Sequence, residues 1–335
     1  MNMTYPNTDF HPPIWLKNPH LQTILPRYVI KHTPAYTRLL IKDSLQESDV
    51  AFDYLLTDDV KIDGKYQKPL IVLFHGMEGS SQSHYAKNLA KAIHEADCHF
   101  VVAHFRSCGG VAVSGKVFYN AGDTTEIHHY LTHLAQEFDQ IYAIGVSLGG
   151  NALAKYMGEY DTNAIPIRSV VVSAPVDLAS SAIAMERLLG RHIYTPYLLN
   201  PIIKKALDNH LTPDELKSLK SAKRIGDFDN IFTAPRHGFR SKNDYYRQSS
   251  ALPFLINIKK PTLIITACDD PFLGLTAEPS DVSDDVCLLN TKYGGHIGFL
   301  NYHHTTKKFD TSFIPRQALD FFELNKSTSP THHIV

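Results

Sequence analysis

Long hydrophobic runs are absent from this sequence, in which no apolar stretch reaches the roughly 20 residues that a membrane-spanning helix needs. A secretory signal is also missing from the first residues, "MNMTYPNTDFHPPIWL", because Asp9 and three prolines stand where a basic and then an apolar segment would be required. We therefore expect no integral membrane segment and a cytoplasmic protein.

Cysteine is scarce, and neither sign of charge is in excess. The four cysteines form no Cys-x-x-Cys pair, so we expect reduced thiols rather than a metal or redox motif of that type. The 33 Lys and Arg residues nearly cancel the 34 Asp and Glu residues, which leaves no broad basic field for nucleic acid or anionic membranes. This balance favours a small-molecule partner and no nucleic acid.

Apolar runs bounded by Pro, Gly or polar residues alternate along the chain with segments of helical periodicity. The runs predict buried strands at residues 69–76, 98–105, 141–146, 169–175, 261–271 and 286–291, after leading strands at 37–43 and 50–56. Helices are predicted at residues 81–96, 122–138, 147–160 and 314–324. Strands that alternate with helices indicate an α/β fold with a mostly parallel sheet and helices on both faces.

Residues 177–251 interrupt this alternation with helix-like patterns and no convincing strand. We predict a helical cap insertion over the strand ends, in a core formed by residues 1–176 and 252–335. The apolar residues of the insertion could line an acyl-chain pocket or only pack the insertion itself; they are Met185, Leu188, Leu189, Tyr194, Tyr197, Leu198 and Leu199. The last residues, 325–335, are typical of a loose tail.

One serine lies between two glycines in "GVSLGG", where the predicted strand 141–146 gives way to a helix. Gly145, Ser147 and Gly149 match G-x-S-x-G, the turn that lifts a nucleophilic serine out of a sheet. A serine hydroxyl is a poor nucleophile at neutral pH, so this interpretation needs a base and a group that orients the base. The alternative is a small residue in a tight turn.

Chain order selects the base and the acid, because this type of site uses Ser, then Asp or Glu, then His. Asp270 in "CDDPF" and His296 in "YGGHIGF" follow Ser147 in that order, at the ends of separate predicted strands. Asp269 competes with Asp270, and successive strand residues point to opposite faces. We prefer Asp270 because the following proline favours an extended conformation there.

An oxyanion loop is predicted at "HGMEG" (75–79), directly after the strand 69–76. In sites of this type, one backbone N–H from this loop and one from the residue after the nucleophile stabilise the negative oxygen of the tetrahedral intermediate. We assign these donors to Met77 and Leu148.

Two further features have a plain interpretation beside a functional one. His129 and His133 have a metal-like spacing, but they do not form His-Glu-x-x-His, so a solvated helix face is favoured and no metal is expected. Arg106 could bind a substrate carboxylate, but pairing with a carboxylate such as Asp123 to fix the turn is favoured.

Motifs along nearly the whole chain carry a family resemblance. They are "FHPPIWLKNPHLQTILP" (10–26), "FHGMEGSSQSHY" (74–85), "AHFRSCGG" (103–110), "YNAGDTTEI" (119–127), "GVSLGGN" (145–151), "FDNIFTAPRHGF" (228–239), "YYRQSSALPFL" (245–255), "CDDPF" (268–272) and "GGHIGF" (294–299). With these motifs the chain resembles the α/β-hydrolase superfamily and, within it, the YheT-like bacterial hydrolases with their eukaryotic ABHD and yeast ethyl-ester synthase/esterase relatives. One departure is His104-Phe105-Arg106-Ser107-Cys108-Gly109-Gly110, where the family usually has Asn-Phe-Arg-Gly-Cys-Ser-Gly; it puts the local turn geometry and any role of His104 in doubt.

The resemblance implies a Ser-His-Asp carboxylic-ester hydrolase that acts on a small-molecule acyl ester without a cofactor. We expect short- to medium-chain acyl groups. A thioesterase, a lipase-like phospholipase or an alcohol acyltransferase with the same residues is the alternative within the enzymes. A hydrolase-fold protein that only binds an apolar ligand is the alternative from another class.

Overall fold

A central sheet of eight strands organises the chain in the computed structural model, which describes residues 10–209 and 211–325. The strand order is β1-β2-β6-β5-β7-β8-β9-β10. The bounds are β1 (Thr37–Lys42), β2 (Asp49–Leu55), β5 (Leu70–Phe74), β6 (His99–Ala103), β7 (Ile141–Val146), β8 (Ser169–Val172), β9 (Thr262–Ala267) and β10 (Val286–Thr291). The strands from β6 to β10 are parallel, whereas β1 and β2 are antiparallel to their neighbours. The predicted mostly parallel α/β sheet is confirmed.

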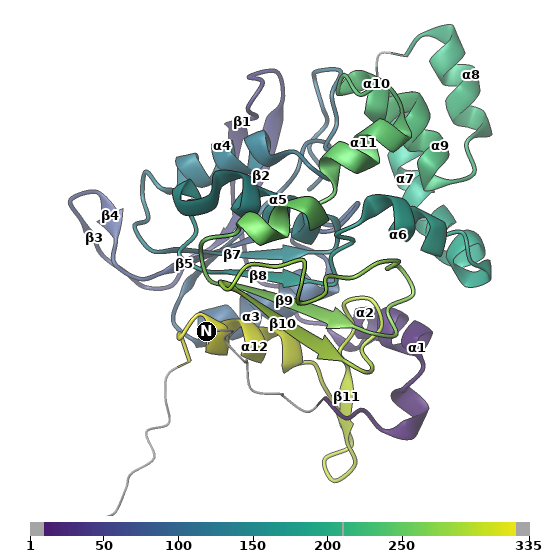
Figure 1. The fold of residues 1–335 in the computed structure, drawn as a ribbon. Coiled ribbons are helices and arrows are strands. Elements are labelled where there is room, and N and C mark those ends of the chain that lie inside the picture. Colours follow the sequence, from purple (N-terminus) through teal and green to yellow (C-terminus); the bar gives the residue numbers. More distant parts are fainter. Residues whose placement is uncertain (1–9, 210, 326–335) are drawn as a thin grey trace, which may run out of the picture.

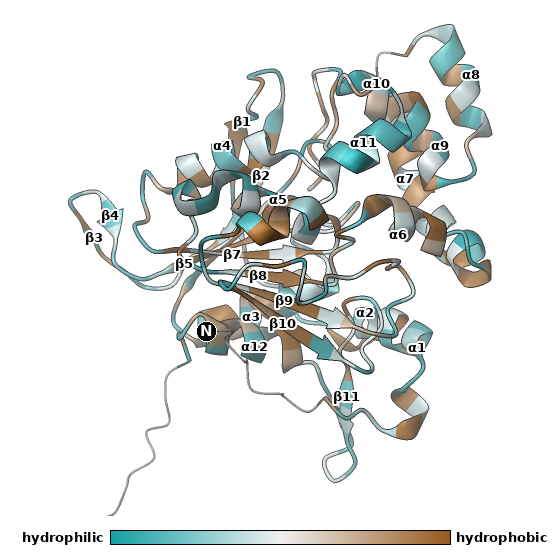
Figure 2. Cartoon of the chain, in the orientation of Figure 1, coloured by the Kyte–Doolittle hydropathy of each residue, from teal (hydrophilic) through white to brown (hydrophobic). Residues whose placement is uncertain are grey.

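Helices cover both faces of this sheet (Figure 1). On one face lie α3 (His84–Glu95) and α12 (Phe313–Phe321), and on the other lie α4 (Thr124–Leu134) and α5 (Leu148–Tyr160). The central strands are buried from both sides, so they read as continuous apolar runs rather than alternating ones, and Figure 2 shows hydrophobic residues along them.

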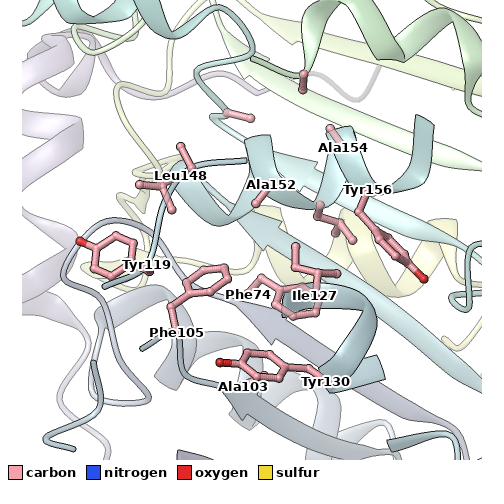
Figure 3. Packing of buried hydrophobic residues seen from close by; sticks show 14 of the residues in the cluster. Phe74, Ala103, Phe105, Tyr119, Ile127, Tyr130, Leu148, Ala152, Ala154 and Tyr156 are labelled. Atoms are coloured by element: carbon pink, nitrogen blue, oxygen red, sulfur yellow. The ribbon is translucent and has the colours of Figure 1, made fainter. Parts of the chain in front are cut away.

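Two hydrophobic cores result, one on each face. Figure 3 shows part of the core under α4 and α5, where Phe74 from β5 and Phe105 beyond β6 lie near Ile127 and Tyr130. The rings of Phe74 and Phe105 stack with their centroids 6.1 Å apart. Leu148, directly after Ser147, belongs to the same core, so the turn that holds Ser147 is anchored by packing.

Residues 177–251 form helices and turns, with no strand among the residues described there. The elements are α6 (Leu178–Ala184), η3 (Gly190–Tyr194), α7 (Thr195–Leu207), α8 (Pro213–Ser221), α9 (Ile225–Phe228), η4 (Asp229–Thr233), α10 (Ala234–Arg236) and α11 (Lys242–Ser249). Phe228, Phe232 and Tyr245 from this segment join the core beneath α4 and α5. The division into a core and a cap remains a prediction.

The start of the chain differs from the expectation of leading strands alone. From residue 10 onward, three short helices precede β1: η1 (Ile14–Leu16), α1 (Pro19–Ile24) and α2 (Pro26–Val29). The Asn18 side chain accepts hydrogen bonds from the N–H groups of His20 and Leu21, and Pro19 occupies the first helical position, so α1 begins with two standard helix-start features.

The remaining elements are short. They are the hairpins β3 (Lys61–Ile62) with β4 (Lys65–Tyr66) and β11 (Asn301–His303) with β12 (Lys308–Asp310), and the helical turns η2 (Asp161–Asn163) and η5 (Leu252–Asn257). Within the described ranges, no helix is long and apolar enough to cross a membrane. Cys98, Cys108 and Cys287 are buried, and Cys268 is exposed. The predicted tail lies, apart from Asn325, outside the described residues, as do the first nine residues of the N-terminal stretch.

Candidate active site

Ser147 lies in the tight turn between β7 and α5 with φ 53° and ψ −121°, a backbone conformation that costs a non-glycine residue energy. Its flanking glycines are required by close backbone approaches. A Cβ on Gly145 would lie 2.6 Å from the carbonyl oxygen of Gly149, and a Cβ on Gly149 would lie 2.4 Å from that of Phe74. The turn is therefore compressed against its own helix and against β5, as a nucleophile turn requires.

A hydrogen-bonded chain joins Ser147 to His296 and Asp270. His296 Nε2 lies 3.0 Å from Ser147 Oγ, and His296 Nδ1 lies 2.9 Å from Asp270 Oδ2. A carboxylate only accepts hydrogen bonds, so Nδ1 carries the ring proton and Nε2 is free to accept from the serine hydroxyl. The Asp270 side chain has no exposed area, and its other oxygen accepts from the Phe272 N–H.

Asp269 takes no part in this chain of hydrogen bonds. Its Oδ1 accepts from the Gly295 N–H at 2.9 Å, while its buried Oδ2 has no hydrogen-bond partner among the described residues. Burial raises the pKa of Asp269, and the charge of Asp270 raises it further. Of the two competing carboxylates, the structure brings Asp270 to the histidine and uses Asp269 to hold the glycine turn before it.

The loop after β5 crosses directly over Ser147. A Cβ on Gly76 would lie 3.2 Å from the Cβ of Ser147, so the loop passes close to the serine at Gly76, the residue before Met77. Leu148 is the first residue of α5, where a helix leaves its N–H groups without intrahelical partners. Across the described ranges, neither the Met77 N–H nor the Leu148 N–H donates a hydrogen bond.

Two buried histidines hold this loop and the neighbouring turn. His104 donates from Nδ1 to the Ala51 carbonyl and accepts at Nε2 from the Ser81 N–H. His75 donates to the Gly76 carbonyl and accepts from the Phe105 N–H. Burial, with His104 as a second cause, lowers the pKa of His75 to about 3, so both rings act as neutral hydrogen-bond groups. The histidine that departs from the family pattern is thus a structural support of the loop.

An ion pair links the same loop to α7. Lys205 Nζ lies 2.7 Å from Glu78 Oε1 and 2.8 Å from the Ser107 carbonyl oxygen. Tyr119 donates to the same Glu78 oxygen at 3.0 Å and accepts from the Glu78 N–H. Glu78 follows Met77 directly and has φ 56°, so these contacts hold a strained residue in the loop.

The N-terminal helix α1 supports the histidine, a contribution that sequence reasoning missed. The His296 N–H donates to Thr23 Oγ1 at 3.0 Å. Gln22, fully buried, donates to the Leu16 and Leu300 carbonyls and accepts from the Leu300 N–H. The signal that could have located α1 was Asn18-Pro19, although nothing in the sequence says where α1 packs.

Phe272 also positions His296. The two rings stack with centroids 4.1 Å apart and an angle of 9° between their planes. Tyr194 of η3 in turn packs on Phe272, with its ring centroid 4.7 Å from that of Phe272. The seven apolar residues named in the insertion differ in burial: Tyr194, Met185 and Leu199 are buried, Leu198 is half-buried, and Leu188, Leu189 and Tyr197 are exposed.

Arg106 and His129, which were considered for other functions, both have structural partners. Arg106 is buried and pairs with Asp123, Asp43 and Glu126, so the favoured interpretation of this arginine is confirmed. His129 donates to the Lys42 carbonyl, and no group of three or more metal-ligating side chains comes together in the part of the chain that the structure describes.

The sequence and the fold have counterparts among known proteins. A family described as "alpha/beta hydrolase fold" matches residues 69–284. YheT of Escherichia coli is 37% identical over 308 residues, which are 88% of each chain. Monoacylglycerol lipase of Saccharomyces cerevisiae is 28% identical over 263 residues, which are 74% of this chain and 58% of that protein. The solved structure of the Pyrococcus furiosus esterase Pf2001 has a TM-score of 0.53 at 14% identity, covers 88% of this chain and 96% of that chain, and supports the fold alone.

Proposed function

Because this chain belongs to the α/β-hydrolase fold family, and within it to the family of YheT, we propose that it is a serine carboxylesterase acting on short- to medium-chain acyl esters. The chain has the hydrolase fold and has esterase and lipase relatives. The observation that carries the proposal is the hydrogen-bonded chain from Asp270 through His296 to the strained Ser147.

In the proposed acylation step, Ser147 Oγ attacks the ester carbonyl carbon while His296 Nε2 takes the hydroxyl proton. Asp270 holds the ring in the required tautomer and stabilises the imidazolium that forms. The stacking of Phe272 on the ring supports this role, since it restricts the orientation of the imidazole. His296 then gives the proton to the leaving alkoxide, and the acyl group remains on Ser147.

The negative oxygen of the tetrahedral intermediate would be stabilised by the Met77 and Leu148 N–H groups. Their lack of partners among the described residues supports this assignment, because donors that are already engaged could not respond to the developing charge. In the second step, a water molecule activated by His296 attacks the acyl carbon and releases the acid.

The segment 177–251 would act as a cap over this site. The contact of Tyr194 with Phe272 supports this, since it places part of the segment one ring away from His296. The acyl chain would then run between the cap and the strand ends.

Hydrolysis of p-nitrophenyl esters by wild type and Ser147→Ala tests the mechanism. We expect a loss of at least about 10³-fold in kcat for Ser147→Ala, because the nucleophile is removed. Ser169→Ala is the matched control, since Ser169 is a buried serine at the start of β8 that hydrogen-bonds Thr262. Equal activity of wild type and Ser147→Ala would refute the proposal.

Labelling by a fluorophosphonate probe separates an enzyme from a binding protein. One covalent adduct on wild type and none on Ser147→Ala is expected, since only an activated serine reacts. A panel of esters and thioesters of graded chain length then tests the substrate class, and a preference for thioesters or for acetyl groups alone would contradict the proposed one.

A further inference from the structure

Exposed large apolar side chains are concentrated in two short segments of the chain. About half of those in the described residues belong to these segments. The ten are Ile14, Trp15, Leu21, Ile24 and Tyr28 in the N-terminal segment, and Ile183, Leu188, Leu189, Ile193 and Tyr197 in the insertion. We call these ten side chains the apolar rim.

The two halves of the apolar rim are adjacent, although more than half the chain separates some of their residues in sequence. The His20 ring nitrogen lies 2.8 Å from the Tyr194 hydroxyl, and the rings stack. Arg27 donates to the Tyr197 hydroxyl and lies over its ring, 4.9 Å from the centroid. In Figure 1, α1 and α6 lie on the same side of the molecule, beyond the carboxyl ends of the central strands.

The apolar rim borders the proposed catalytic site. A continuous row of rings leads from His20 through Tyr194 and Phe272 to His296. Leu275, a few residues after Asp270, is also exposed, and its N–H donates to the hydroxyl oxygen of Ser180 in α6. An ester that enters between the two segments would therefore pass the apolar rim before it reaches Ser147.

Helix α1 buries a polar side chain and leaves apolar side chains partly exposed, unlike a surface helix that only packs on the protein. Gln22 has no exposed area, whereas Leu21 and Ile24 are 39% and 37% exposed. An amphipathic helix at a protein surface normally buries its apolar side chains and exposes its polar ones. The outer face of α1 therefore presents partly exposed apolar side chains to the surroundings.

The same two segments carry a local excess of positive charge. Between Phe10 and Lys31 there is no acidic residue, whereas Lys17, Arg27 and Lys31 are basic. In the insertion, Arg187 and Arg191 are exposed, and neither forms an ion pair within the described ranges. The acid near them, Glu186, pairs with Arg224. The overall balance of charge thus conceals a basic region at the apolar rim.

We propose that the apolar rim docks on an anionic lipid bilayer and brings the mouth of the site to the membrane surface. Apolar side chains that enter the boundary between headgroups and acyl chains, flanked by Lys and Arg that attract anionic lipids, give reversible interfacial binding without a spanning helix. This inference concerns the surface alone and does not depend on the reactivity of Ser147.

Exposed apolar residues elsewhere have a different setting, which supplies a matched control. Val60 and Ile62 at the β3–β4 hairpin are 67% and 56% exposed, and three of their four nearest charged neighbours along the chain are acidic: Asp58, Asp59 and Asp63, against Lys61. Acidic neighbours disfavour an anionic surface, so this hairpin should stay in water.

Tryptophan fluorescence tests the docking directly, because Trp15 in the apolar rim is the single tryptophan of the chain. With vesicles of phosphatidylglycerol and phosphatidylcholine in equal parts, we expect a blue shift and a gain in intensity, and co-sedimentation of the protein. Vesicles of phosphatidylcholine alone should give much weaker effects, and added salt should reduce those seen with the anionic vesicles. Absence of both signals with anionic vesicles, or equal signals with both kinds of vesicle, would overturn the proposal.

Two paired variants then locate the surface. Ile183→Asp with Leu188→Asp should lower the partition coefficient on anionic vesicles at least about tenfold, whereas Val60→Asp with Ile62→Asp should leave it near the wild-type value. Replacing Arg187 and Arg191 by Gln should lower it about fivefold for each charge removed. Equal losses in the two Asp pairs would contradict the assignment of the surface.

Two controls keep this inference separate from others. Ser147→Ala should bind vesicles as wild type does, so a failure of the esterase proposal leaves the docking result readable. The Trp15 fluorescence could instead shift to the blue with rising protein concentration in the absence of lipid. If Ile183→Asp abolishes that shift, a second copy of the chain covers the apolar rim and the lipid proposal is wrong.

Discussion

Lys205→Met is expected to slow ester hydrolysis by loosening the loop that carries Met77. Lys205 from α7 pairs with Glu78, the residue after Met77, and also bonds the Ser107 carbonyl. Met keeps the length and apolar stem of the side chain but removes the charge. Glu78 would then keep only the hydroxyl of Tyr119 as a side-chain partner, and its strained backbone would lose a restraint.

The magnitude follows from the burial of the pair. The side chains of Glu78 and Lys205 are 11% and 31% exposed, so the pair lies between a solvent-exposed ion pair, at about 0.2–1 kcal/mol, and a buried one, whose disruption costs about 3–5 kcal/mol. A cost of about 1–3 kcal/mol is therefore expected. If about half of it falls on the oxyanion contact, kcat decreases roughly tenfold.

The assay compares kcat and KM for p-nitrophenyl esters in Lys205→Met and Lys204→Met. Lys204 is the next residue on the same helix, is exposed, and makes no ion pair within the described ranges, so its variant controls for the change of charge on α7. The loss should appear in kcat more than in KM, because in the proposed mechanism the Met77 N–H would act on the intermediate rather than on the bound ester. Equal kcat values for the two variants, both folded by thermal denaturation, would refute the reasoning.

Two further outcomes are expected. Asp270→Asn should lower kcat about 10⁴-fold, because it disturbs the tautomer of His296. Asp269→Asn alters the side chain that bonds the Gly295 N–H and should lower kcat less than about tenfold. Similar losses of kcat in both variants would contradict the assignment of the acid. Burial raises the pKa of Asp229 from 3.8 to about 6, so its contribution to stability is present below about pH 4 and is lost as the pH rises through about 6. Urea unfolding should therefore show the free energy of unfolding of Asp229→Asn rising relative to wild type by up to about 3 kcal/mol across that range, and a difference independent of pH would contradict this.

The main elements of the fold could be predicted because their patterns are local. The strands 141–146 and 286–291 coincide with β7 and β10, and the other predicted strands and helices differ from the structure mainly at their ends. Continuous apolar runs between helical segments have one economical arrangement, a sheet covered on both faces. The sequence order of Ser147, Asp270 and His296 at strand ends similarly identified residues that the structure brings within hydrogen-bonding distance.

The supports of the site could not be predicted, because each joins positions that are far apart in the chain. His296 bonds Thr23 across more than 270 positions, and Glu78 bonds Lys205 across 127. No local pattern encodes such pairs, since Lys and Glu are common surface residues and each has many potential partners. The short hairpins β3–β4 and β11–β12 were missed for a related reason, as their two- and three-residue strands are too short to show periodicity.

Helix α1 departs from ordinary hydrophobic patterning. Such a pattern would bury Leu21 and Ile24 and expose Gln22, whereas Gln22 is fully buried and Leu21 and Ile24 stay partly exposed, because Gln22 makes three hydrogen bonds to the backbone of Leu16 and Leu300. A buried amide that is fully bonded costs little, but exposed leucine and isoleucine gain nothing in water. The same helix bonds the histidine loop on its inner face and carries part of the apolar rim on its outer face. If the rim docks on lipid as proposed, the element that meets the membrane is also the one that holds His296, so docking and the geometry of the site would be mechanically linked.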